Sequence, residues 1–225
     1  MFAFFFCFNL LASELYIGTS TADITPALPV ALAGQFDMRI AVTAETPLKA
    51  NVVVIESREG SKSLDVTIMV SCDLVYISAQ ILAMVRQETA KRLPDLDVNK
   101  IILNATHTHT APVLEDGNDA SFLYPIPKEG VTQVKTYRAF FTQHVVEAVV
   151  KAWQSRSAGS VGWGLSRSAV GYNRRAVYAN KTTVMYGKTD LPEFRSLEGY
   201  EDHDINSLFF WNAAGKLIAV SVDVA

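Results

Sequence analysis

Residues 65–104 contain the pattern that decides the fold, and they read DVTIMVSCDLVYISAQILAMVRQETAKRLPDLDVNKIILN. Asp65 to Ser71 is rich in β-branched residues and is typical of a strand. Ser78 is expected to cap an amphipathic helix that runs to Leu93. Lys100 to Asn104 is a second short apolar strand. Strand, helix and strand therefore alternate across this stretch, as they do in an α/β layer.

The flanking sequence extends this pattern in both directions. Leu48 to Glu56 is a further β-branched run, and the turn around Gly60 favours a hairpin with the strand that begins at Asp65. The other expected elements are a short strand over Leu15–Gly18, a turn over 21–26, a long helix over about 132–152, and strands over 160–170 and 207–223 that flank a polar loop. The sequence predicts an α/β (mixed α+β) fold in one domain, with layered mixed sheets and helices packed on the faces.

Composition excludes several classes of protein. The chain has 225 residues, 49% of them hydrophobic and 19% charged, which is ordinary for a globular protein with a sizeable core. A formal net charge of −3 without a basic stripe argues against nucleic-acid binding. With Cys7 and Cys72 as the cysteines, neither a disulfide framework nor a cysteine-rich zinc knuckle is expected. We interpret Cys72 as a small buried hydrophobe.

The two ends of the chain carry their own signals. Residues 1–12, MFAFFFCFNLLA, are apolar and too short to span a bilayer, but they fit the core of a signal peptide. We therefore expect export, to the periplasm or outside the cell, and no transmembrane span. Residues 219–225 read as a strand without a following turn or polar tail, so we expect the chain to be truncated at its C-terminus.

His107 and His109 lie one residue apart, directly after the apolar run 101–103. In an extended chain residues i and i+2 point to the same side, so we expect both imidazoles to leave the strand end together. Neutral imidazole nitrogen is a common zinc ligand, and histidine also carries protons near neutral pH. We interpret the pair as the start of a metal or catalytic site; the alternative is an exposed strand end that binds nothing.

Other polar residues have two readings. Arg174 and Arg175 follow a predicted strand and supply fixed positive charge for a carbonyl, carboxylate or phosphate oxygen, or they are simply solvated or salt-bridged. Asp73 either orients a histidine or caps the helix that starts near Ser78. His144, inside the second helix, is expected at the core edge or in solvent.

Three more positions are expected to be structural. His203 lies in the acidic segment Glu201-Asp202-His203-Asp204, where a loop-to-strand role is favoured over a cation site. Asp23 is expected to form a turn before Pro26, and Gly34 to occupy a tight backbone position.

Taken in order, several segments resemble the N-terminal part of the neutral, non-lysosomal ceramidases and their bacterial relatives, and this resemblance covers nearly all of the chain after residue 12. The segments are Ile17-Gly18, Ala22-Asp23-Ile24-Thr25-Pro26, Leu32-Ala33-Gly34, Ser71-Cys72-Asp73-Leu74, Thr106-His107-Thr108-His109, Asn173-Arg174-Arg175, 198–203, 208–211 and 217–220.

The resemblance implies a zinc-dependent amidase that cleaves the N-acyl bond of ceramide. It implies that His107 is a zinc ligand, that His109 is a second histidine beside the metal, and that Arg174 faces the substrate. A bound zinc lowers the pKa of its water and polarises an amide carbonyl, which agrees with these roles. The chain departs from the family motif at Thr110–Val113, where the family has a glycine-rich run.

In that family a further histidine, a glutamate and a tyrosine complete the zinc site, and an active-site serine accompanies them. The resemblance implies that these lie beyond the region which this chain covers. We expect residues 13–225 to be the N-terminal part of a catalytic domain that hydrolyses linear amides of a lipid or amphiphile when full length, and to be inactive alone. The alternative is a non-catalytic extracytoplasmic binding module built on the same fold.

Overall fold

The computed structural model describes residues 13–115 and 124–224. The expected leader over residues 1–12 lies outside them. The chain divides into two compact units, a subdivision that its composition did not indicate. The first unit ends at Ser160 and also takes in Asn212–Lys216; the second comprises Val161–Trp211 and the chain from Leu217 onward.

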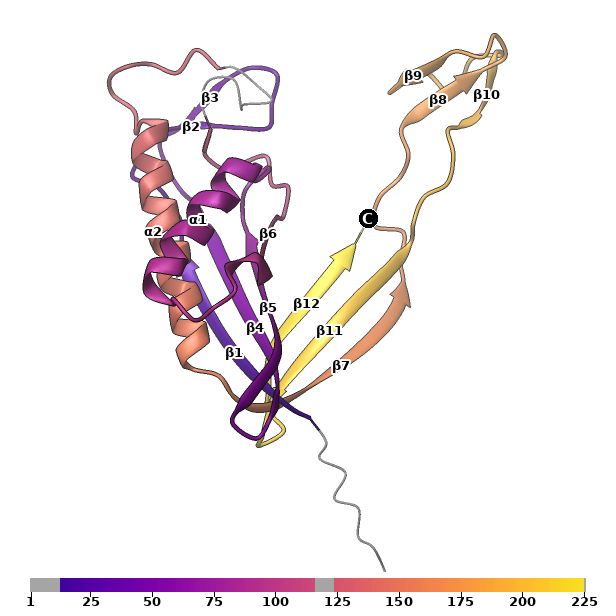
Figure 1. Cartoon of the computed structure of the whole chain (residues 1–225). Coiled ribbons are helices and arrows are strands. Elements are labelled where there is room, and N and C mark those ends of the chain that lie inside the picture. The colour runs from indigo at the N-terminus through magenta and orange to yellow at the C-terminus, as the bar shows by residue number, and fades with distance from the viewer. Residues whose placement is uncertain (1–12, 116–123, 225) are drawn as a thin grey trace, which may run out of the picture. The chain divides into compact units, whose positions relative to one another are not determined.

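The first unit is a mixed sheet with two helices (Figure 1). Its strand order is β7-β1-β4-β5-β6, in which β5 and β6 are parallel and the other neighbours are antiparallel. The elements are β1 (Glu14–Asp23), β4 (Lys49–Glu59), β5 (Lys62–Cys72), α1 (Ala79–Arg92), η1 (Val98–Lys100), β6 (Ile101–Ala105), α2 (Val134–Gln154) and the start of β7 (Ser157–Arg167). A separate hairpin joins β2 (Val30–Leu32) to β3 (Arg39–Ala41).

Alternation along the strands creates the core of this unit. Ala50, Val52 and Val54 of β4 are buried, while Asn51, between the first two, is exposed. In β5, Ile68 and Val70 are buried on either side of the partly exposed Met69. These buried side chains share one hydrophobic cluster with residues of both helices. The expected mixed α+β class with layered sheets is confirmed, and both helices cover the same face of this sheet.

Gly18 lets α2 approach β1 closely. A Cβ atom at this position would lie 2.0 Å from the carbonyl oxygen of Ala152, so a larger residue would push the helix away from the strand. Near the other end of α2, the hydroxyl of Tyr137 donates a hydrogen bond of 2.9 Å to the carbonyl oxygen of Ile24. These contacts fix α2 against the sheet at both of its ends.

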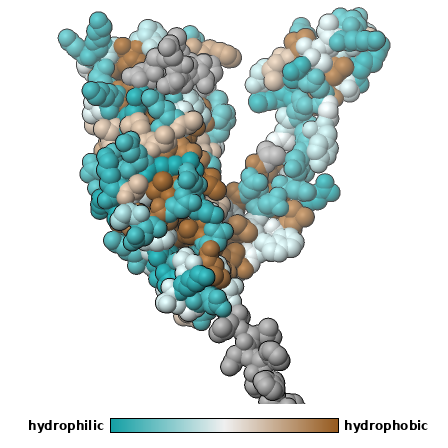
Figure 2. All heavy atoms as spheres, viewed as in Figure 1, coloured by the Kyte–Doolittle hydropathy of each residue, from teal (hydrophilic) through white to brown (hydrophobic). Residues whose placement is uncertain are grey.

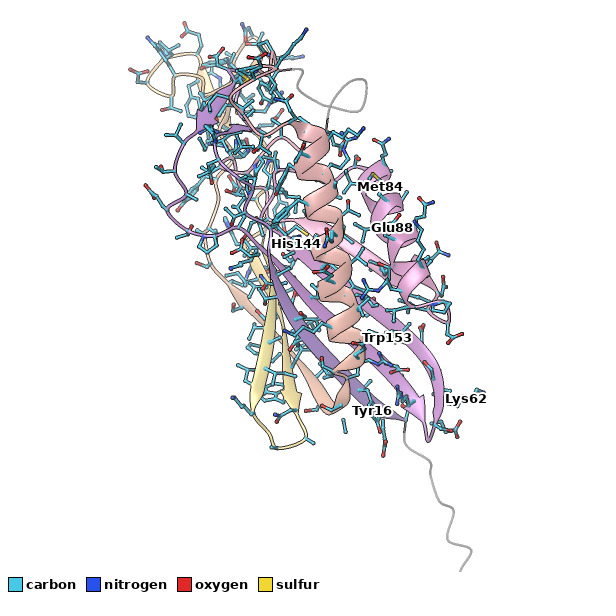
Figure 3. All side chains as sticks on the ribbon, turned by 90° about the vertical axis from the view of Figure 1, so that its left-hand side faces the viewer. Tyr16, Lys62, Met84, Glu88, His144 and Trp153 are labelled. Carbon is cyan, nitrogen blue, oxygen red and sulfur yellow. The ribbon has the colours of Figure 1, made fainter. Side chains whose placement is uncertain are left out.

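A buried ion cluster lies where α2, β1 and β4 meet. Glu56, whose side chain is 2% exposed, accepts hydrogen bonds from Arg58 at 2.8 Å and from Arg156 at 2.6 Å. Arg58 lies over the ring of Tyr16 and Arg156 over the ring of Trp153, both of which are labelled in Figure 3. Each charge is therefore paired and covered, as a buried charge requires.

The second unit contains the rest of β7 with β11 (Asp204–Asn212) and β12 (Leu217–Val224), in the order β12-β11-β7. The expected strand over 207–223 is in fact this antiparallel pair, which turns at Gly215 with φ +73°. A second sheet, in the order β10-β8-β9, contains β8 (Arg175–Tyr178), β9 (Thr183–Met185) and β10 (Phe194–Leu197). The polar loop expected between residues 170 and 207 was wrong, because these short strands lie there.

Candidate functional site

Two loops meet beyond the parallel strands β5 and β6 of the first unit (Figure 1). One follows Cys72 and leads to α1; the other follows Ala105 and contains the histidine pair. The amide of Thr106 donates a hydrogen bond of 2.9 Å to the carbonyl oxygen of Cys72, which ties the loops together. Loops at the carboxyl ends of neighbouring parallel strands are a common place for functional residues.

His107 is held by one of these loops. Its Nδ1 lies 2.7 Å from the carbonyl oxygen of Val75. A carbonyl can only accept, so Nδ1 carries a proton, and in the neutral imidazole Nε2 then keeps its lone pair. Metal-binding histidines are usually oriented in this way, by a carbonyl or carboxylate on the nitrogen that does not bind the metal. The exposed imidazole of His107 is therefore fixed in the tautomer that a zinc ligand needs.

The two imidazoles are neighbours, with ring centroids 5.0 Å apart and ring planes at 74°. The expected geometry that brings them together was wrong. β6 ends at Ala105, and His107 has φ +62°, in the left-handed region, so the segment is not an extended strand end. A sharp backbone turn at His107, rather than strand alternation, places the rings side by side.

His109 is held from the β2–β3 hairpin. Gly34 has φ +93°, and a Cβ there would lie 2.7 Å from Cγ of His109, which confirms the tight position expected of this glycine. The guanidinium Nη2 of Arg39 donates to the carbonyl oxygen of His109. Arg39 was not predicted as a site residue, because a contact between residues 70 positions apart leaves no local signal in the sequence.

Asp73 contacts the start of the histidine segment, residues 106–113, and caps no helix. Its carboxylate accepts hydrogen bonds from the amide of Lys49 at 2.8 Å and from the hydroxyl of Thr106 at 3.3 Å. Ser78 caps α1 itself, since its Oγ accepts a hydrogen bond of 3.2 Å from the amide of Ile81. Asp73 therefore acts on the residue before His107 rather than on an imidazole.

Glu115 is a further residue at these loops, for which no role was predicted from the sequence. It is 1% exposed, and its Oε1 accepts a hydrogen bond of 3.0 Å from the amide of Ser78. The loop that carries Val75 is therefore held at its start by Asp73 and at its end by Glu115. Both contacts support the carbonyl that orients His107.

The remaining histidines belong to other segments of the chain, and Cys72 is the last residue of β5. His144 lies midway along α2 in Figure 3, with Nδ1 2.8 Å from the carbonyl oxygen of Phe140 and its ring against that of Phe140. The carbonyl of His203, in the second unit, accepts a hydrogen bond from Ser168 just before β11. Cys72 is fully buried, as expected, and burial raises the pKa of its thiol to about 12.

Arg174 belongs to the second unit, just before β8. Arg175 begins β8 and Arg174 directly precedes it, so the expected placement of both arginines at the end of a strand was wrong. Arg174 is exposed, with its guanidinium 5.0 Å from the centre of the Tyr186 ring. Arg175 instead forms an ion pair of 2.7 Å with Glu198. That Arg174 converges with the histidines stays a prediction.

The donor set partly fits a zinc ion. His107 and His109 supply two neighbouring imidazoles, whereas a catalytic zinc normally takes three protein ligands. Within residues 13–115 and 124–224, no group of three or more His, Cys, Asp and Glu side chains is arranged to hold a metal. A zinc at this pair would therefore need further ligands from outside the described residues.

A cavity of about 330 Å³ lies beside the histidine segment in the first unit. Its wall includes Thr110 and Pro112, which follow the histidine pair, and Val30 and Leu32 of β2. Most other lining side chains are aliphatic or threonine, and Glu45 is the charged one among them. The cavity therefore offers aliphatic surface together with threonine hydroxyls.

Comparisons with known proteins identify the fold. No family model and no curated protein matches the chain. Among solved structures it is similar to neutral ceramidase from Pseudomonas aeruginosa, with a TM-score of 0.67 and 18% identity over 94% of this chain and 31% of that one. A ceramidase complexed with C2 gives a TM-score of 0.64 and 19% identity, over 94% and 31% of the two chains.

The likeness at these identities is one of fold, and at that level it confirms the resemblance inferred from the sequence motifs. The chain spans 31% of the length of either ceramidase. In the part of the chain that the structure describes, no helix is long and apolar enough to cross a membrane.

Proposed function

We propose that this chain forms part of an exported, zinc-dependent hydrolase of linear amides related to neutral ceramidase. In this proposal His107 is a zinc ligand, His109 carries a proton, and Arg174 faces the substrate. The observation that carries it is the orientation of His107 by the Val75 carbonyl, with a second imidazole beside it, in a fold shared with two ceramidases.

Each residue has a chemical task. When bound, zinc supplies an activated water at neutral pH and polarises the amide carbonyl. His107 keeps Nε2 free to coordinate the zinc ion because Nδ1 is hydrogen-bonded to the carbonyl oxygen of Val75. His109, next to it, accepts the proton of the attacking water and returns it to the leaving amine. Arg174 donates to the oxygen on which negative charge develops.

The substrate class follows from the cavity beside the histidine segment. Its aliphatic lining fits the hydrocarbon part of an amphiphilic amide, and the four threonines can donate to polar groups near the scissile bond. Ceramide is the substrate type of the similar proteins by their names. We propose a lipid or lipid-like amide for this chain.

Zinc-dependent thermal stabilisation of the intact protein tests the proposal. Binding to the native state raises its stability by about 2.7 kcal/mol at a zinc concentration 100 times Kd, or about 5–10 °C in Tm for a domain of this size. His107→Ala should remove this gain. His144→Ala is the matched control and should keep it, because the His144 ring contacts Phe140 within α2.

Hydrolysis of an N-acyl amide bearing a fluorescent chain tests the chemistry. The zinc-loaded full-length protein should cleave it, and His109→Ala should lower kcat by about 100-fold or more. Zinc binding without turnover would favour the alternative, a non-catalytic binding module. No zinc-dependent change in Tm would contradict the metal site itself.

A further inference from the structure

We propose that Arg39 is a positioning residue of the histidine site, which sets the orientation of His109 by holding its backbone carbonyl. This inference deepens the proposed function and rests on it for its catalytic meaning. Its evidence is separate, because it comes from the contacts that the β2–β3 hairpin makes with the segment after His107.

The hairpin is hydrogen-bonded to the histidine segment along its length. The amide of Ala33 donates to the carbonyl oxygen of Ala111, and the amide of Val113 donates to the carbonyl oxygen of Ala31, both at 2.9 Å. Leu32 and Pro112 form an antiparallel bridge between these bonds. The chain just after His109 is therefore registered on β2 to within one residue.

Arg39 acts from the other strand of the same hairpin. It lies opposite Leu32, and its Nη2 donates to the carbonyl oxygen of His109. Gly34, at the turn between the strands, packs against the His109 ring with no room for a side chain. His109 is thus held at its carbonyl by Arg39 and at its ring by Gly34.

In the part of the chain that the structure describes, the Arg39 guanidinium has no other polar partner than the carbonyl oxygen of His109. No carboxylate there forms an ion pair with it, and its Nε is buried without a hydrogen-bond partner. Burying an unpaired donor costs free energy, and a residue kept only for packing would not need a guanidinium. The bond to His109 is the interaction that accounts for this group.

His107 is held differently, which makes the two imidazoles separable by experiment. Its ring is fixed by Val75, from the loop after β5, whereas His109 depends on the hairpin. Loss of the Arg39 guanidinium should therefore release His109 and leave the His107–Val75 hydrogen bond in place.

Long-range proton–nitrogen NMR spectra of the imidazoles, recorded on the metal-free chain, test this inference. Arg39→Ala should shift and broaden the His109 signals, while those of His144 and His203 stay in place. Arg39→Lys, which keeps the charge but not the planar fork, should give a smaller shift in the same direction. Arg92→Ala, at the exposed end of α1, is the control for loss of one positive charge.

Unchanged His109 signals in Arg39→Ala would overturn the inference, as would an equal shift in Arg92→Ala. If Arg39→Ala does not fold, the decision passes to Arg39→Lys, where unchanged His109 signals would again overturn it. Since no metal is present, the result does not depend on zinc binding. Where the parent binds zinc, Arg39→Ala should weaken the affinity by about 10- to 100-fold, as is usual for groups that orient a metal site.

Discussion

The two units differ in how far they bury the apolar side chains of their sheets. The first covers one face of its sheet with helices and buries Phe141 and Tyr137 almost completely. In the second, Ala176 and Phe210 are the buried hydrophobic residues among those described, and Trp163 is 78% exposed. Figure 2 shows hydrophobic residues at the surface of this unit among hydrophilic ones. Strand pairing alone makes a sheet, but burying its apolar side chains needs a second layer.

Truncation of one large aromatic residue in each unit should give the largest contrast. Phe141→Ala removes a fully buried ring from α2, and we expect it to lower the free energy of unfolding by about 3–5 kcal/mol. Trp163→Ala removes an exposed ring and should cost under about 0.5 kcal/mol. Urea unfolding followed by circular dichroism measures both. Equal losses would show that exposure does not distinguish the two units energetically.

Breaking one ion pair in each unit should give the next largest contrast. Glu56→Gln leaves Arg156, which is 10% exposed, without its buried partner, and we expect a loss of about 3 kcal/mol. Glu198→Gln breaks the pair with Arg175, whose side chains are 45% and 40% exposed, and should cost under about 1 kcal/mol. Thermal unfolding at neutral pH compares the two variants.

The carboxylate of Glu56 also predicts a pH dependence of stability. Burial raises the pKa of Glu56, but hydrogen bonds from Arg58, Ser63 and Arg156 outweigh it and hold the pKa below its ordinary value of 4.5. The Glu56 carboxylate therefore binds a proton more readily in the unfolded chain than in the folded one. Its contribution to the free energy of unfolding is present above about pH 4.5 and is lost as the pH falls through the pKa of the folded state. Between about pH 6 and pH 3, Tm should fall more steeply in the parent than in Glu56→Gln.

Much of the first unit could be predicted from the sequence because its signals are local. The β4–β5 hairpin, α1 with its Ser78 cap, and β6 are confirmed, and α2 differs by two residues at each end. Each of these elements follows from periodicity, a capping residue or a turn glycine. The short strands β8, β9 and β10 could not be found in this way, because they lack an alternation of buried and exposed side chains.

The candidate site was predictable in its residue types but not in its geometry. The spacing of His107 and His109 drew attention to the right segment. The rings meet because His107 adopts a left-handed backbone conformation, which nothing in a Thr-His-Thr-His pattern indicates. Val75 and Arg39, which orient the pair, contact it from 32 and 70 residues away in the sequence. Such contacts follow from the tertiary fold alone.

The smallest expected effect is the change in stability of the second unit when a residue of the first unit is substituted. Ser78→Ala removes the cap of α1 and should cost about 1 kcal/mol. Trp153 reports on the first unit, and Trp163 and Trp211 on the second. With fluorescence from Trp153 alone, in a background where the other two are phenylalanine, the transition should shift to lower denaturant. In the reverse background, Trp153→Phe, the fluorescence of Trp163 and Trp211 reports on the second unit, and its transition should shift less. An equal shift there would mean that the two units unfold together, so that their different packing would not give them different stabilities.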